Sequence, residues 1–77
     1  MIPEIKEITY KKNFIYHIRF TDDREGDIDL KPFLWGEAFE SLKNPTYFQK
    51  AFVDKDSGTI TWPNGTDIAP ETLYSVV

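Results

Sequence analysis

The 77-residue sequence contains no cysteine and a single histidine. Without cysteine the chain cannot form disulfides, and one histidine alone cannot build the Cys/His clusters that hold structural zinc. The sequence also lacks an apolar run near the length of about 18 residues that a membrane-spanning helix requires, and it has no signal peptide. We therefore expect a cytoplasmic protein, away from membranes, that needs no cofactor and no metal.

Basic residues are fewer than acidic ones. Nine Lys and Arg stand against thirteen Asp and Glu, which gives a formal net charge of −4. Binding to the phosphate backbone of DNA requires a basic surface, so direct DNA binding is not expected. The charge is uneven: residues 1–20 hold four basic and two acidic residues, a net of +2, while residues 21–77 hold five basic and eleven acidic residues, a net of −6. This asymmetry is more typical of a surface that steers a protein partner than of a catalytic site.

Aromatic residues, in contrast, are abundant: six Phe, four Tyr and two Trp. A chain of this size buries only about 60% of its unfolded surface. Each aromatic side chain adds on the order of 150–250 Å² of buried area. We expect these residues to build the core of a single domain that spans residues 1–77.

The first part of the chain predicts a three-stranded antiparallel meander. Glu4–Tyr10 reads as a strand with Ile8 and Tyr10 on one face and Ile5 on the other. Phe14–Thr21 alternates strictly, and its two faces consist of Phe14, Tyr16, Ile18 and Phe20 on the core side and Ile15, His17, Arg19 and Thr21 on the other. A turn at Asp22–Gly26 then leads to a third strand, Asp27–Lys31, through a connection too short for a parallel crossover.

The second part predicts short helices and another hairpin. Glu37–Lys43 reads as a short helix, and Asn44-Pro45 as a cap and first position of a helical turn over Thr46–Ala51. Phe52-Val53 and Thr59–Trp62 flank a turn at Asp54–Gly58. Pro63-Asn64-Gly65 is a second turn, and Pro70 begins a last helical turn that ends at Tyr74.

These elements predict an α+β fold: a small antiparallel β-sheet, made of the three-stranded meander plus a C-terminal β-hairpin, with short helices packed on one side. Trp35, in the apolar segment Phe33–Trp35, is expected to join Trp62 in the core, since a small domain needs the apolar area. A tryptophan exposed instead would point to a binding surface. The predicted core consists of Phe14, Tyr16, Ile18, Phe20, Ile28, Leu30, Phe39, Leu42, Phe48, Ile60, Trp62 and Leu73.

Three polar patterns were compared with known kinds of site. Asp54–Gly58 resembles the start of a calcium loop, but its glycine is one place early and Gly65 stands where the bidentate glutamate is required, so a hairpin turn is the better interpretation. The acidic residues of 22–29 are interpreted as a solvated face. His17 lacks a nucleophile or a catalytic motif around it. The sequence therefore predicts no catalytic, cofactor-binding or metal-ligating residue, and the chain is not expected to be an enzyme.

The closing run W-P-N-G-T-D-I-A-P-E-T-L-Y (62–74) resembles the signature of the bacterial domain of unknown function 2442 family. The strand Phe14–Thr21, the segment Asp27–Leu34 and the motif Asn44–Phe48 fit the same family, so the resemblance covers essentially the whole chain. The family has no assigned activity. The resemblance implies that the gene often lies beside the gene of another small protein, as in a toxin–antitoxin pair. It also implies relatives in which a similar domain precedes a helix-turn-helix.

Two hypotheses about function follow. In the first, the chain is a non-enzymatic protein-interaction or regulatory module that meets a partner, or a second copy, through its first hairpin. Ile15, His17 and Arg19 are the predicted binding residues, with Ile5 beside them as a second exposed apolar group. In the alternative, the chain is a transcription-linked sensor domain that acts with a separate helix-turn-helix protein.

Overall fold

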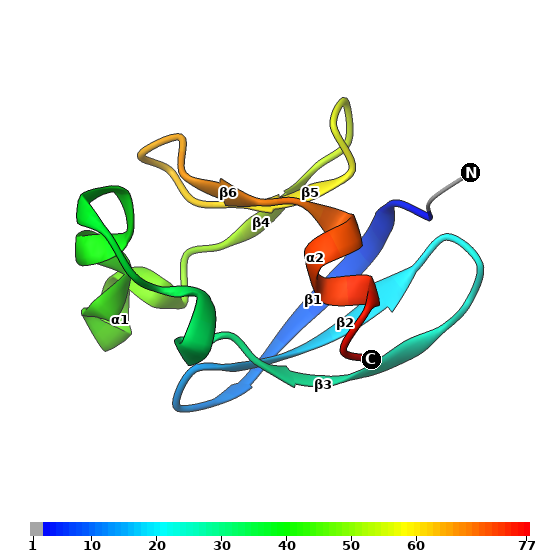
Figure 1. Cartoon of the computed structure of the whole chain (residues 1–77), viewed down its shortest axis with the longest axis horizontal. Helices are drawn as coiled ribbons and strands as arrows, with labels where there is room; N and C mark the ends of the chain where they lie inside the picture. The colour runs from blue at the N-terminus through cyan, green and yellow to red at the C-terminus, as the bar shows by residue number, and fades with distance from the viewer. Residues whose placement is uncertain (1–2) are drawn as a thin grey trace.

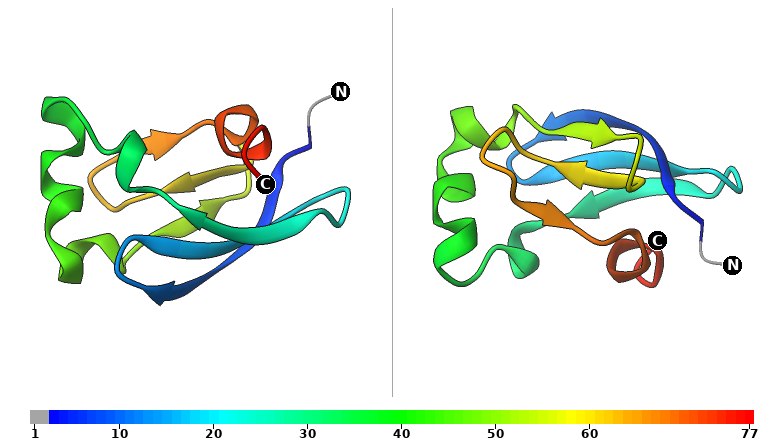
Figure 2. Two further views of the ribbon diagram at one scale, coloured as in Figure 1. Left: turned by 60° about the horizontal axis from the view of Figure 1, so that its bottom comes forward. Right: turned by 90° about the horizontal axis from the view of Figure 1, so that it is seen from above.

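The computed structural model describes residues 3–77. It contains two three-stranded antiparallel sheets that face each other across one core (Figures 1 and 2). The first sheet has the order β1-β2-β3, and the second has the order β4-β5-β6. The strands are β1 (Ile5–Lys12), β2 (Ile15–Phe20), β3 (Glu25–Asp29), β4 (Phe52–Asp54), β5 (Thr59–Thr61) and β6 (Asp67–Ile68). The predicted α+β class is confirmed, with one extra strand, β6, which extends the C-terminal hairpin.

Short helical segments close the two ends of this arrangement. Two 3₁₀ helices, η1 (Lys31–Phe33) and η2 (Glu37–Lys43), lead into α1 (Pro45–Phe48) at one end, and α2 (Pro70–Tyr74) lies at the other (Figure 2). The predicted cap at Asn44 is confirmed: its Oδ1 accepts hydrogen bonds from the amides of Thr46 (2.9 Å) and Tyr47 (3.3 Å). Glu37–Lys43 is helical as expected, in the tighter 3₁₀ form.

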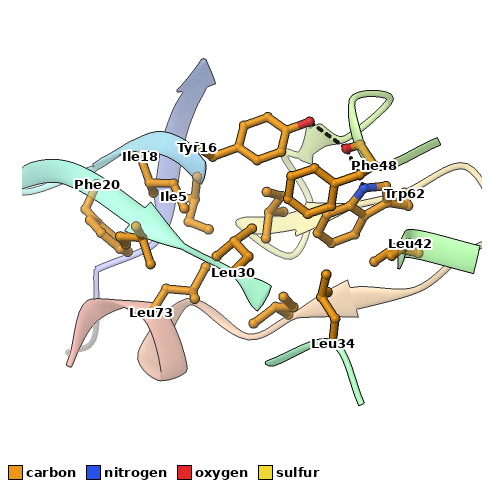
Figure 3. Packing of buried hydrophobic residues seen from close by; sticks show 13 residues of the cluster. Ile5, Tyr16, Ile18, Phe20, Leu30, Leu34, Leu42, Phe48, Trp62 and Leu73 are labelled. Atoms are coloured by element: carbon orange, nitrogen blue, oxygen red, sulfur yellow. Dashed lines mark hydrogen bonds between the residues drawn. The ribbon is translucent and has the colours of Figure 1, made fainter. Parts of the chain in front are cut away.

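The core contains ten of the twelve residues predicted for it, and the other two, Phe14 and Phe39, pack against it while partly exposed. At the end of the core next to α1, the carbonyl oxygen of Phe48 accepts two side-chain hydrogen bonds, one from the Tyr16 hydroxyl (2.8 Å) and one from Trp62 Nε1 (2.9 Å) (Figure 3). These bonds join α1 to β2 of the first sheet and to Trp62, the residue that follows β5 of the second sheet. Two buried aromatic residues with polar tips thereby satisfy a carbonyl that α1 leaves free.

The prediction that Ile5 lies off the core is wrong. Ile5 is buried and contributes to the core cluster. The register of β1 on β2 shifts between Ile5 and Glu7, so Lys6 is an extra residue at a β-bulge. The bulge returns Ile5, which pairs with Phe20, to the face that also carries Ile8 and Tyr10.

Gly58 fixes the position of β1 against the second sheet. Its carbonyl oxygen accepts a hydrogen bond from the Ile5 amide (2.9 Å), and its φ of 68° is in the left-handed region. A β-carbon at this position would collide with the side chain of Glu4. The turn therefore requires glycine both for its conformation and for the close approach of the two sheets.

The prediction that Trp35 is buried is also wrong, because the residue is 76% exposed. Its neighbour Leu34 fills the inward position instead and is 5% exposed. Gly36 has a φ of 88°, which redirects the chain into η2 directly after Trp35. The indole is therefore held on the surface by a buried residue on one side and a tight turn on the other.

Candidate binding site

The first candidate surface is the outer face of the first sheet, where the structure places the three predicted binding residues. Ile15, His17 and Arg19 lie in line along β2 and are half-buried, while the alternate residues of β2 are buried in the core. The structure thus brings the three residues together on one face, as the alternation predicts. It separates Ile5 from them.

His17 lies between two carboxylates from β3. Its Nδ1 is 2.7 Å from Oδ1 of Asp27, the residue directly opposite in the register, and its Nε2 is 2.8 Å from Oε1 of Glu25. These hydrogen bonds, the one to Glu25 first, raise the pKa of His17 above its usual value. A carboxylate at each ring nitrogen favours the protonated form of the imidazole, and both ring nitrogens are engaged in hydrogen bonds.

Arg19 is paired in a similar way. Its guanidinium is 3.1 Å from Asp23 and 3.6 Å from Glu7 on β1. The outer face of the first sheet therefore carries a set of ion pairs in which acidic residues from β1, from β3 and from the turn between β2 and β3 surround His17 and Arg19 of β2. The positive charge of the first hairpin, seen in the sequence, is neutralised on this face by the folding of β3 beside it.

The second candidate surface is a groove beside Trp35. It has a volume of about 390 Å³ and runs between the segment that links η1 to η2 and the edge formed by β6. Its apolar lining comes from Phe33, Trp35, Phe39, Ile68 and Ala69. This volume lies within the range of about 300–1,000 Å³ that is usual for ligand pockets.

The groove is held open by anchored parts of the chain. The Thr66 hydroxyl donates a hydrogen bond to the carbonyl oxygen of Ala38 (3.0 Å), which ties the turn before β6 to η2. Ile68 is buried, and Phe33 and Phe39 pack against the core. The walls are therefore preformed, and Trp35 projects at the rim.

The charge of the groove is of one sign. The two charged residues in its lining are Glu37 and Asp67, and no basic residue lines it. Within residues 3–77 neither carboxylate takes part in an ion pair. An acidic, aromatic groove of this kind favours a cationic and apolar ligand.

Comparison with protein families matches residues 5–76 to the profile described as protein of unknown function (DUF2442). The chain belongs to this family. No curated protein and no solved structure matches it significantly. The resemblance found in the closing run 62–74 is thus confirmed over nearly the full length of the domain.

In this DUF2442 chain the signature residues shape the groove. The turn of the signature ends at Gly65, whose amide donates a hydrogen bond to the Trp62 carbonyl oxygen (2.9 Å). The acidic and apolar residues that follow in the signature, Asp67 and Ile68, form β6. Pro70 begins α2 as predicted. The groove was not predicted from the sequence, because its two walls are about thirty residues apart in the chain and nothing local to Trp35 indicates that it is exposed.

Two further features concern metal ions and membranes. Among residues 3–77 no group of three or more His, Asp or Glu side chains is placed to hold a metal ion. The two carboxylates beside His17 contact different ring nitrogens, Asp27 at Nδ1 and Glu25 at Nε2. None of the helices of residues 3–77 has the length and apolar character of a membrane span.

Proposed function

We propose that this chain is a non-enzymatic, cytoplasmic module that acts by binding a second polypeptide, and that Trp35 is the centre of its binding surface. The observation that carries the proposal is the exposure of Trp35, at 76%, on the rim of a preformed apolar groove. Tryptophan is enriched among the residues that dominate binding energy at protein interfaces, and small domains otherwise bury it.

The outer face of the first sheet is the second surface in this proposal. Ile15, His17 and Arg19 form a half-exposed row there, flanked by carboxylates of β1 and β3. A partner or a second copy of the chain would meet an apolar residue, Ile15, beside fixed ion pairs. Such a surface contributes register and specificity more than affinity.

The test is recovery of a partner from cells that make the protein, by cross-linking and mass spectrometry, with surface variants compared in parallel. Trp35→Ala is expected to abolish recovery. Phe52→Ala is the matched control, since Phe52 is also an exposed aromatic residue, 47% exposed, but lies on β4 outside the groove. Ile15→Asp tests the second surface and is expected to weaken the association while the fold stays intact.

The identity of the recovered chain separates the two regulatory hypotheses. A small protein encoded beside this one supports a toxin–antitoxin-like pair. A helix-turn-helix protein supports the transcription-linked sensor. Recovery that is equal for the wild type, Trp35→Ala and Ile15→Asp contradicts the proposal that these surfaces bind a partner.

A further inference from the structure

The groove beside Trp35 runs along an open strand edge. β6 is the last strand of the second sheet, in the order β4-β5-β6. The Trp62 amide donates to the Thr66 carbonyl oxygen (2.8 Å) and the Trp62 carbonyl oxygen accepts from the Gly65 amide (2.9 Å), so Trp62 is the hydrogen-bonded position that closes the turn between β5 and β6. The next opposed pair, Thr61 and Asp67, is then a non-hydrogen-bonded pair, because the two kinds alternate in antiparallel sheets.

This alternation fixes the direction of the Asp67 backbone. Its N–H and C=O groups point away from β5, toward the outer edge of the sheet. No backbone hydrogen bond from another loop, turn or cap within residues 3–77 reaches either group. Asp67, Ile68 and Ala69 all line the groove, so this free edge forms one of its walls.

We propose that the groove binds an extended segment of the partner polypeptide, which adds as a further strand to β6 and carries Lys or Arg flanked by apolar residues. This inference rests on the proposed function and names the chemistry of the partner. The residue opposite Asp67 would exchange both backbone hydrogen bonds with it and place its side chain on the same face as the Asp67 carboxylate. A basic residue there pairs with Asp67, while Glu37 and the Trp35 ring supply further attraction for a cation.

The two flanking residues would point to the opposite face of the added strand, the face that Ile68 shares on β6. Ile68 is buried, and the groove beside it is lined by Phe33 and Phe39. Apolar side chains are therefore the matching occupants at both flanking positions. The apolar–basic–apolar alternation follows from the pleat and from the charge of the groove.

A second copy of this chain does not fit the description. Its sequence holds one Lys or Arg flanked on both sides by large apolar residues other than proline, in Ile18-Arg19-Phe20. That triplet belongs to β2, the central strand of the first sheet, and is paired on both sides by β1 and β3. The occupant is consequently a different polypeptide.

The experiment uses the full chain and a capped peptide of sequence Gly-Ser-Val-Lys-Val-Ser-Gly. Binding is followed by the emission of Trp35 and by the amide NMR signals of Asp67 and Ala69, with peptide added up to millimolar concentration. We expect both amide signals to move. Trp35→Ala is expected to weaken binding by about 30-fold or more, the size of a hot-spot contact, and Phe52→Ala is expected to leave it unchanged.

Two further peptides test charge and strand addition separately. Replacing the lysine by glutamate is expected to weaken binding up to about fivefold, and the Asp67→Lys variant is expected to reverse this preference. Methylation of the lysine amide nitrogen removes the backbone donor to Asp67 and is expected to weaken binding about two- to tenfold.

The outcomes of these experiments separate strand addition by a basic segment from the broader proposal that Trp35 binds a partner. Unmoved Asp67 and Ala69 signals at millimolar peptide, equal binding of the lysine and glutamate peptides, or indifference to N-methylation overturns strand addition by a basic segment. If Trp35→Ala still abolishes recovery of the cellular partner in that case, the proposed function stands and only this inference fails. Self-association of the chain that depends on Trp35 would instead identify a second copy as the occupant and would also overturn it.

Discussion

At the scale of single residues, the two tryptophans have opposite environments. Trp62 is fully buried, with its indole N–H bonded to the Phe48 carbonyl oxygen, whereas Trp35 is mostly exposed. The indole N–H of Trp62 has a fixed partner, while Leu34 takes the inward position next to Trp35. Local sequence could not distinguish the two residues, because both follow apolar or β-branched neighbours in a chain that needs aromatic area.

This difference is measurable by fluorescence. We expect Trp35→Phe to shift the emission of the folded protein to shorter wavelength and to remove most of its quenching by acrylamide, since the remaining Trp62 is shielded from water. Circular dichroism should show an unchanged fold. A Trp35→Phe protein whose emission stays red-shifted and fully quenchable would contradict the placement of the two residues.

His17 is the only histidine, so its titration can be followed without assignment of other imidazole signals. We expect its pKa, measured by NMR, to lie above the ordinary value of 6.5, because Glu25 and Asp27 accept hydrogen bonds from the ring. Glu25→Gln and Asp27→Asn should each lower that pKa, because each removes a carboxylate that accepts a hydrogen bond from the ring. Asp29→Asn, on the same strand and without a bond to His17, is the control.

The sign of the linked stability follows from the raised pKa. Because the folded state holds the proton more tightly than the unfolded chain, the stabilisation is complete below pH 6.5 and is lost as the pH rises through the folded-state value. Denaturant unfolding at several pH values should show this loss in the wild type. The double variant Glu25→Gln, Asp27→Asn should show a smaller one.

At the scale of elements, the double hydrogen bond to Phe48 joins α1 to β2 and to Trp62, the residue that follows β5. Tyr16→Phe alone should destabilise the protein by only about 0.5–1.5 kcal/mol, because Trp62 still satisfies the carbonyl oxygen. Trp62→Phe should cost more, since it also removes buried volume. In the double variant the carbonyl is left buried without a partner.

We therefore expect the two substitutions to be non-additive, with an extra loss of roughly 1–3 kcal/mol for the unsatisfied carbonyl. Denaturant titration of the four proteins in this cycle measures the difference. Additive losses would mean that water or a backbone shift replaces the missing donors. Tyr10→Phe, which loses a hydrogen bond to the exposed Asn13 carbonyl, serves as a surface control.

The elements themselves were largely predictable from the sequence. The strict alternation of β2, the proline and asparagine signals at Asn44, Pro45 and Pro70, and the turn at Gly65 all act within a few residues of where they appear. The bulge at Lys6 was not predictable, since only the pairing with β2 shows that Ile5 belongs to the core. The same holds for the ion pairs of His17, which depend on the register of β3, and for the groove, which needs residues from two distant segments.

At the scale of the whole molecule, the net charge of −4 opposes binding to nucleic acid. Thirteen acidic residues stand against nine Lys and Arg, so the phosphate backbone of DNA meets net repulsion. We expect no binding to duplex DNA tighter than micromolar at physiological salt. Fluorescence anisotropy with a labelled duplex measures this, and sub-micromolar affinity that persists as salt is raised would contradict it.

β1 has a consequence for the behaviour of the protein at high concentration. It stands at the edge of the first sheet, and its pairing with β2 is interrupted twice, with Lys6 and Lys11 as the extra residues. An interrupted, lysine-bearing edge is a poor template for another strand, because the new chain would meet misaligned amides and repelling charges. The irregularity that places Ile5 in the core therefore also protects the molecule against growth into fibres, and a chain in which both bulges were removed would be expected to lose that protection.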